Sequence, residues 1–208
     1  MESDLALLDA ARSMDVGALT KIFDLYSQPL YKYAFRLCND AWLADQIVGD
    51  VFSKLLEYLS AGKGPQANLR SYLYEMAYHI IVDEARFAHR AAPIEVLDLE
   101  YKDGNSVSLS VENGVLLETV LRAIRDDLTG DQRHVVILRF LEEFSLKETA
   151  AIIGKTVNDV KVIQNRAIAA LRKSLDRQMV KTRAVPLGLG NLKARNSFAI
   201  VGVYSEEK

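Results

Sequence analysis

The sequence holds a single cysteine, Cys38, so no disulfide can form within the chain. Its three histidines are far apart and do not form a local zinc-binding pattern. No apolar run approaches the roughly 18 residues that a membrane-spanning helix requires, and the N-terminus lacks the basic and apolar stretches of a secretion signal. These absences lead us to expect a protein of the reducing cytoplasm without a membrane span.

Recognisable catalytic groups are missing as well. The sequence shows no pairing of a nucleophile with a base, no phosphate-binding glycine loop and no cluster of metal ligands. Cys38 follows Leu37 in an apolar stretch, which favours a small core residue over a reactive thiol. We therefore predict no catalytic residues, no metal and no other cofactor, and an enzyme is the least favoured class of function.

What is present is an ordinary globular composition of 208 residues, 50% of them hydrophobic and 26% charged, enough for one or two domains. A net charge of -2 argues against nucleic-acid binding, because phosphate contacts require lysine and arginine. The average hides a segregation of charge, however. Residues 155–183 hold eight basic and two acidic side chains, whereas residues 93–118 hold six acidic and one basic.

Apolar residues recur at helical spacing through most of the first 90 residues. One amphipathic helix is predicted from Val16 to Leu37, in which we expect Pro29 to introduce a break or kink. Asp40 is a suitable N-cap for a second helix, and a third begins at Leu69 after a glycine-rich loop. Residues 1–90 are therefore predicted to form a helical domain.

The helical periodicity fails over residues 91–114, a stretch longer than most loops inside a compact domain. We interpret it as a flexible acidic linker, whose two dozen residues span about 80 Å when fully extended. Residues 115–176 are predicted to form a second helical domain. The fold class is thus all-α, with two small helical domains joined by a linker.

Residues 177–208 are predicted to form a C-terminal extension. Its segment Ser197–Tyr204 has the composition of a β-strand, which needs a partner strand or a cover. The extension either folds back on the helical domains, adds to the sheet of a partner, or is a plain disordered tail. Our hypothesis is that it tunes activity by covering an interaction surface.

The second domain carries the pattern of a helix-turn-helix. Ser145 and Glu148 have the spacing of a capping box, and Gly154 suits the tight turn between two short helices. A basic helix follows, from Val157 to about Leu175. With its apolar stripe buried, its outward side chains can meet phosphates and base edges in a major groove. The alternative is an ordinary solvated helix of a bundle.

Three tyrosines, Tyr72, Tyr74 and Tyr78, lie near several cations on the predicted third helix. Aromatic side chains beside cations are typical of sites for unstacked bases. Tyrosines at helical spacing are equally typical of a core, and we expect at least one of the three to be buried.

Residues 44–52, Ala-Asp-Gln-Ile-Val-Gly-Asp-Val-Phe, resemble the polymerase-binding helix of the bacterial sigma-70 family. Residues 68–86 resemble the adjoining promoter-melting segment, and residues 128–140 with residues 160–172 are similar to region 4 of that family. Only a linker stands where larger members insert a third domain. This organisation resembles the extracytoplasmic-function (ECF) class of sigma factors.

The resemblance implies a transcription initiation factor that binds core RNA polymerase, recognises the -35 element as duplex DNA and melts the -10 element. Its implied partners are the beta-prime clamp helices and beta flap of core RNA polymerase, promoter DNA, and an anti-sigma factor. The acidic linker either threads toward the active centre of the polymerase or serves only as a solvated tether. The rival interpretation is a stand-alone helix-turn-helix regulator that never joins polymerase.

The resemblance also assigns site residues, which fall into three sets. The implied polymerase-binding residues are Asp45, Gln46, Gly49, Asp50 and Ser53. The implied -10 DNA-binding residues are Lys63, Asn68, Arg70, Tyr72, His79, Arg86 and Arg90. The implied -35 DNA-binding residues are Thr156, Asn158, Lys161, Val162, Asn165 and Arg166.

Four positions depart from the residues common in the family: Gly49, Tyr72, Tyr78 and His79. Fewer cations on the melting helix weaken its hold on DNA phosphates, so promoter specificity cannot be carried over from the family. Gly49 lowers helix propensity by about 1 kcal/mol relative to alanine. Either polymerase approaches closely at this position, or the helix simply tolerates the glycine.

Overall fold

The computed structural model describes the backbone of residues 4–90 and 111–183, and the side chains of residues 5–87 and 118–177. Helices joined by turns make up these ranges, which contain no strand, and the predicted all-α class is confirmed for them. None of the helices described is both long and apolar enough to cross a membrane. The predicted strand Ser197–Tyr204 and most of the predicted linker lie outside the described residues.

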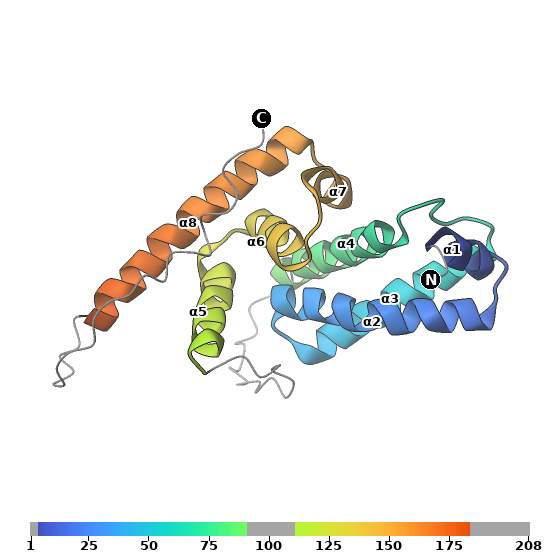
Figure 1. Ribbon diagram of the computed structural model, residues 1–208, viewed down its shortest axis with the longest axis horizontal. Helices are drawn as coiled ribbons and strands as arrows, with labels where there is room; N and C mark the ends of the chain where they lie inside the picture. Colours follow the sequence, from blue (N-terminus) through green and yellow to red (C-terminus); the bar gives the residue numbers. More distant parts are fainter. Residues whose placement is uncertain (1–3, 91–110, 184–208) are drawn as a thin grey trace. The chain divides into compact units, whose positions relative to one another are not determined.

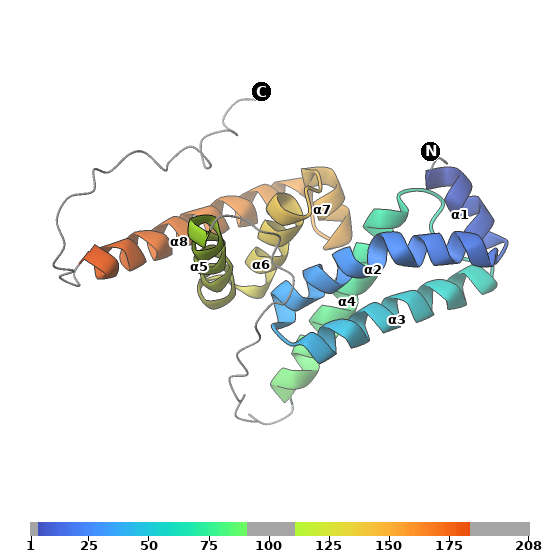
Figure 2. The same ribbon diagram turned by 60° about the horizontal axis from the view of Figure 1, so that its bottom comes forward.

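The N-terminal part consists of α1 (Asp4–Arg12), α2 (Val16–Cys38), α3 (Ala41–Ser60) and α4 (Leu69–Arg90). Helices α2 and α3 pack along one another, α4 packs against both, and α1 contacts α2 and α3 (Figures 1 and 2). The buried stripes of these helices meet in one apolar core, as their periodicity predicts.

Side-chain caps set the beginnings of α2 and α3. Asp15 accepts a hydrogen bond from the backbone N–H of Ala18 at 2.7 Å, and Asp40 accepts one from that of Leu43 at 3.0 Å. Each carboxylate satisfies an N–H that has no partner inside the helix, and the predicted cap at Asp40 is confirmed.

Of the break or kink expected at Pro29, the break does not occur, because α2 runs through this position from Val16 to Cys38. A proline inside a helix deprives the carbonyl four residues earlier of its partner. That residue, Leu25, is exposed, so water can hydrate the carbonyl there.

The C-terminal part consists of α5 (Val111–Asp127), α6 (Gly130–Val136), the π-helix η1 (Ile137–Leu141), α7 (Leu146–Ile152) and α8 (Val157–Arg183). Contacts group the chain up to Leu175 into one compact unit, and the rest of α8 belongs to a second. Helix α5 begins four residues before the predicted end of the linker, and α8 continues beyond its predicted end near Leu175.

The helical segment that follows α5 is divided between α6 and η1. In η1 the backbone N–H of Glu142 donates to the carbonyl of Ile137, five residues earlier, at 2.9 Å. A π-turn of this kind holds one residue more than an α-turn and appears often at functional sites. It changes the direction in which the following residues point.

The predicted helix-turn-helix pattern is present. Ser145 and Glu148 form the expected capping box, with Glu148 N–H donating to Ser145 Oγ at 3.2 Å and Ser145 N–H donating to Glu148 Oε2 at 2.8 Å. Gly154 has a φ of 65°, the left-handed conformation that glycine adopts without strain. Thr156 and Asp159 then cap the start of α8 reciprocally, at 3.1 and 3.2 Å.

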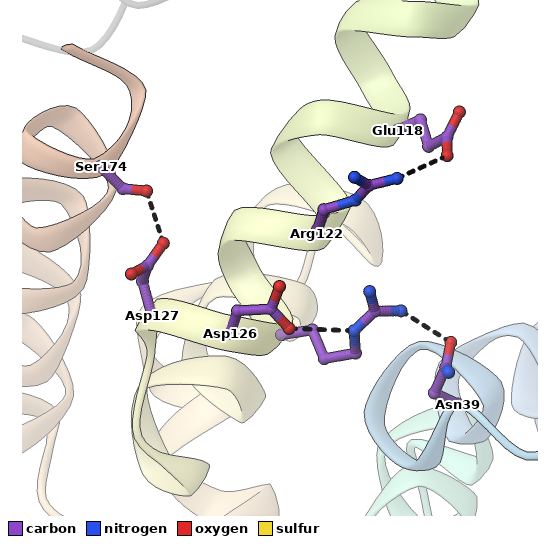
Figure 3. A network of polar contacts seen from close by, with 7 residues as sticks. Asn39, Glu118, Arg122, Asp126, Asp127 and Ser174 are labelled. Carbon is purple, nitrogen blue, oxygen red and sulfur yellow. Dashed lines mark hydrogen bonds and ion pairs between the residues drawn. The ribbon is translucent and has the colours of Figure 1, made fainter. Parts of the chain in front are cut away.

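Polar contacts hold α5 to its neighbours (Figure 3). Ser174 of α8 donates to the carboxylate of Asp127 at the end of α5. Arg125 donates to Asn39, the residue that ends α2, at 2.9 Å. Through these bonds α5 joins the N-terminal helices to α8.

Candidate functional site

Helix α3 has a buried stripe and, on its other side, a polar exposed face. All five residues implied for polymerase binding belong to that exposed face: Asp45, Gln46, Gly49, Asp50 and Ser53. A side chain added at Gly49 meets no atom within 4 Å, so the fold of the chain itself does not require a glycine there. The structure thus brings the whole set together on one exposed face of one helix.

The residues implied for the -10 element are divided between a loop and α4. Lys63 and Asn68 are exposed in the loop between α3 and α4, and His79 and Arg86 are exposed on α4. Tyr72 is half-buried. The side chain of Arg90 lies outside the described residues.

At 100° per residue, Tyr72, His79 and Arg86 fall within about 40° of one another around α4, whereas Arg70 falls on the opposite side. The structure accordingly does not bring Arg70 together with the rest of its set. Its guanidinium lies 4.1 Å from the centre of the Phe144 ring and donates to the backbone carbonyl of Glu142. Arg70 therefore contacts another part of the chain.

Two of the three tyrosines belong to the interior, as the core alternative predicted. Tyr74 is fully buried and Tyr78 is 9% exposed. Burial raises the pKa of both phenols, and the carboxylate of Glu142 raises that of Tyr74 further. Neither ring is available in this arrangement to stack on a base, which leaves Tyr72 as the aromatic candidate.

A buried polar cluster joins α2 and α4 to the segment around η1, and the sequence reasoning did not find it. Glu142, 8% exposed, forms an ion pair with Arg36 of α2 at 2.8 Å and accepts the hydroxyl hydrogen bond of Tyr74 of α4 at 2.6 Å. Tyr33 of α2 lies 2.9 Å from Nδ1 of His134, which is 5% exposed. These partners are 68 to 106 residues apart along the chain, so no local pattern signals them.

The implied -35 residues occupy the start of α8 and its cap, and every one of them is exposed: Thr156, Asn158, Lys161, Val162, Asn165 and Arg166. The stripe behind them is anchored by Val160 and Ala167, which are completely buried. This half of α8 therefore offers two cations, two amides and one apolar side chain to a partner.

Cys38 is partly buried at the end of α2. Burial, followed by the nearby carboxylate of Asp40, raises the pKa of its thiol to about 11. The thiol stays protonated at neutral pH and is a poor nucleophile, consistent with the predicted structural role.

Comparison with known proteins finds a match for each of the two helical parts of the chain. The family model "Sigma-70 region 2" matches residues 22–91, and "Sigma-70, region 4" matches residues 126–173. The ECF RNA polymerase sigma factor BldN of Streptomyces coelicolor is 27% identical over 177 residues, which are 82% of this chain and 65% of that protein. The ECF RNA polymerase sigma factor SigX of Bacillus subtilis is 26% identical over 160 residues, 74% of this chain and 82% of that protein.

Two solved structures share the fold. The sigma factor RpoE in complex with the anti-sigma factor NepR from Bartonella quintana has a TM-score of 0.62 and 22% identity, covering 77% of this chain and 98% of that one. CnrH in complex with the cytosolic domain of CnrY also has a TM-score of 0.62 and 22% identity, covering 85% of this chain and 99% of that one. At this level of identity the likeness concerns the fold alone.

Proposed function

Because this chain belongs to the sigma-70 family, in its extracytoplasmic-function class, we propose that it is a transcription initiation factor that directs core RNA polymerase to specific promoters. The observation that carries the proposal is the presence of both family regions in one chain, each with an exposed polar helix face. A single chain that binds polymerase through one region and duplex DNA through the other can bring polymerase to a chosen DNA site.

Polymerase binding is assigned to the exposed face of α3. Asp45 and Asp50 supply negative charge on this face, and Gly49 leaves a position between them without a side chain. Charged side chains at the edge of an interface orient the partner, and the absence of a side chain permits close approach. The beta-prime clamp helices are the partner that the family membership implies.

Reading of the -35 element is assigned to the first half of α8. A helix fits the major groove of B-DNA, where lysine and arginine bind guanine or phosphate and asparagine pairs with adenine. Lys161, Asn165 and Arg166 supply these groups, and the exposed Val162 can contact a thymine methyl group.

Melting of the -10 element is assigned to the loop before α4 and to the face of α4 that carries Tyr72, His79 and Arg86. Extracting a base from the DNA stack costs a few kcal/mol of free energy. Stacking of that base on an aromatic ring and contacts to the DNA backbone must offset this cost. Tyr72 supplies the ring and Lys63 with Arg86 the cations. Arg70 is not needed for this face.

Two further assignments complete the proposal. An anti-sigma factor restrains the protein until a signal releases it, and the beta flap of polymerase holds the C-terminal helices. Both belong to the cytoplasm, where we place the chain.

The test is transcription in vitro with purified core polymerase on a library of promoter fragments. We expect the chain to confer site-selective initiation, and the selected fragments to reveal the -35 and -10 sequences. An Asp45→Ala, Asp50→Ala double variant should lose association with polymerase, while Asp24→Ala, at an exposed position of α2, serves as its control.

A second pair of variants examines α8. Lys161→Ala should weaken promoter use about fivefold or more, since a good base contact contributes roughly 1–3 kcal/mol. Lys32→Ala, which removes an exposed cation of α2, should have no effect. The stand-alone regulator makes a different prediction. In that case the chain alone retards duplex DNA in a gel-shift assay. The Asp45→Ala, Asp50→Ala double variant then leaves both polymerase association and promoter opening unaltered.

A further inference from the structure

We propose that Arg12 of α1 is a positioning residue for -10 recognition, because it holds the loop between α3 and α4 in the shape in which that loop presents its residues to DNA. The inference rests on the proposed function, which gives this loop its role. It adds a helix that ends before residue 22, where the match to region 2 begins. Arg12 acts on the loop and does not itself contact the DNA.

Helix α1 is anchored firmly enough to serve as a support. Leu8 is 1% exposed and Ala11 is completely buried, and both belong to the apolar core in which α1 contacts α2 and α3. Both views of the ribbon place α1 beside the loop that leads into α4 (Figures 1 and 2). A side chain at the end of α1 therefore extends toward the loop from a fixed position.

The loop of residues 61–68 has few hydrogen bonds of its own. Its first half is tied to the end of α3, where the N–H of Lys63 donates to the carbonyl of Tyr58 at 2.7 Å. Within the described part of the chain, residues 64–67 form no hydrogen bond with one another or with another backbone group. Residues 66–68 are all exposed. This half of the loop keeps one shape only with support from outside it, since ordering each residue costs conformational entropy.

Arg12 supplies this support at the point where the loop enters the protein. Pro65 is the only buried residue of the loop, and its carbonyl accepts a hydrogen bond from Nη2 of Arg12, 53 residues earlier. The other terminal nitrogen of Arg12, Nη1, lies 3.2 Å from the carboxylate of Asp9, one turn earlier in α1. Asp9 thus orients the guanidinium toward the loop. A hydrogen bond from a charged donor of this kind is stronger than one between neutral groups.

The backbone next to Pro65 is also fixed from the side of α3. Gly64 has a φ of 132°, a conformation that glycine adopts far more readily than other residues, and a Cβ there would lie 3.1 Å from the side chain of Leu59. The loop therefore passes close to the end of α3 at Gly64 and is bonded to α1 at Pro65. Two adjacent residues are held by two different helices, which determines where residues 66–68 lie.

A fixed loop matters more for selectivity than for attachment to DNA. A loop that already has its bound shape loses little conformational freedom on binding, which raises the affinity. Discrimination between bases also requires donors and acceptors at fixed positions, because a mobile loop adapts to the wrong base as well. Loss of the Arg12 bond should therefore weaken the base preference at -10 and leave the preference at -35, which is assigned to α8, unchanged.

The first experiment measures the mobility of the loop in the full-length protein without DNA. A nitroxide is attached through Gln66→Cys, an exposed position, in a Cys38→Ala background. Arg12→Met removes the donors and keeps an unbranched side chain. It should raise the ratio of the mobile to the immobile component of the electron paramagnetic resonance spectrum about tenfold, as the loss of a charge-assisted hydrogen bond does. Arg12→Lys keeps a donor for the Pro65 carbonyl and should largely restore the original ratio.

Lys32→Met is the matched control, because it removes a cation from an exposed position of α2. It should leave the spectrum unchanged. Circular dichroism shows whether each variant is folded. Should Arg12→Met fail to fold, Asp9→Asn removes the charge that orients the guanidinium and should also raise the mobile component.

The second experiment is transcription with core polymerase on the library of promoter fragments. Arg12→Met should reduce the ratio of preferred to other bases at -10 about fivefold or more, the equivalent of one lost base contact, without changing the -35 preference. A merely structural role of Arg12 would instead lower initiation at all promoters alike.

Three results overturn the proposal: a uniform loss of initiation in Arg12→Met, an unchanged -10 preference, or a mobile component that equals that of Lys32→Met. Failure of the proposed function is distinguishable from these. If the unmodified chain confers no initiation on any fragment, the assigned function is rejected, and the resonance spectra alone decide whether Arg12 holds the loop.

Discussion

His134 is buried with a phenol as its partner, and its neutral state carries a consequence for stability. Burial first, and then the neighbouring guanidinium of Arg133, lower the pKa of its imidazole from 6.5 to about 4. The unfolded chain therefore binds a proton between pH 6.5 and pH 4 that the folded chain does not. The contribution of neutral His134 to the free energy of unfolding is fully present above pH 6.5 and is lost as the pH decreases toward 4.

We predict a loss of about 3 kcal/mol in the free energy of unfolding from this group by pH 4. Urea unfolding at pH 7.5, 5.5 and 4.5 measures it, with His134→Gln expected to flatten the dependence relative to the unmodified protein. His79→Gln, at an exposed position, should leave the slope as it is. Equal slopes for all three proteins would contradict the assignment to His134.

The loss of helix stability caused by Gly49 can also be measured. Alanine is favoured over glycine in a helix interior by about 1 kcal/mol, and a Cβ at this position meets nothing. Gly49→Ala should therefore raise the melting temperature by several degrees. A several-fold weaker association with polymerase alongside this gain identifies close approach by the partner, whereas unchanged association identifies a tolerated glycine.

At the scale of elements, the capping box before α7 positions the first helix of the helix-turn-helix. The hydrogen bonds from Ser145 also lower the pKa of Glu148, so the box depends on an ionised carboxylate. Ser145→Ala should reduce the free energy of unfolding by about 1 kcal/mol, measured by chemical denaturation. Lys147→Ala, an exposed change within the same helix, should have little effect.

The long amphipathic helices were predictable because periodicity and caps agree in them. Asp40 and Ser145 mark where α3 and α7 begin, and Gly154 marks the turn after α7; each does so by a local mechanism that the structure shows. Helix α1 was not predicted, since its 9 residues leave few turns in which a period can be recognised. The π-helix was not predicted either, because the apolar run from Val135 to Leu138 is equally compatible with an α-helix and a π-helix.

The exposed faces of α3 and α8 follow from the same periodicity, and the separation of Arg70 from Tyr72 follows from the angle between successive residues. The cluster around Glu142 does not follow from any local rule. Its partners become neighbours only when helices 68 to 106 residues apart in sequence pack together. Glu142 is followed by a second glutamate, Glu143, and nothing in the sequence marks the first of the two as the one with such partners.

For the whole molecule, the helices on both sides of the Glu142 contact share one apolar core, in which Tyr33 and Leu73 join Ile137 and Phe144. Elements that share a core unfold together. We predict one calorimetric transition with equal calorimetric and van't Hoff enthalpies for the unmodified protein. Arg36→Ala should broaden or split this transition, and two separate transitions in the unmodified protein would contradict a common core.

The π-turn also concerns the length of the chain. Such a turn takes up one extra residue while the helical segments on either side keep their facing, because the widened turn absorbs the added length. A chain that lacks one residue between Val136 and Glu142 can restore an ordinary α-turn there, and we expect it to keep the ion pair of Glu142 with Arg36. Related sequences that are one residue shorter in this segment should therefore preserve the same contacts, which makes the π-turn a place where chain length can vary without loss of the fold.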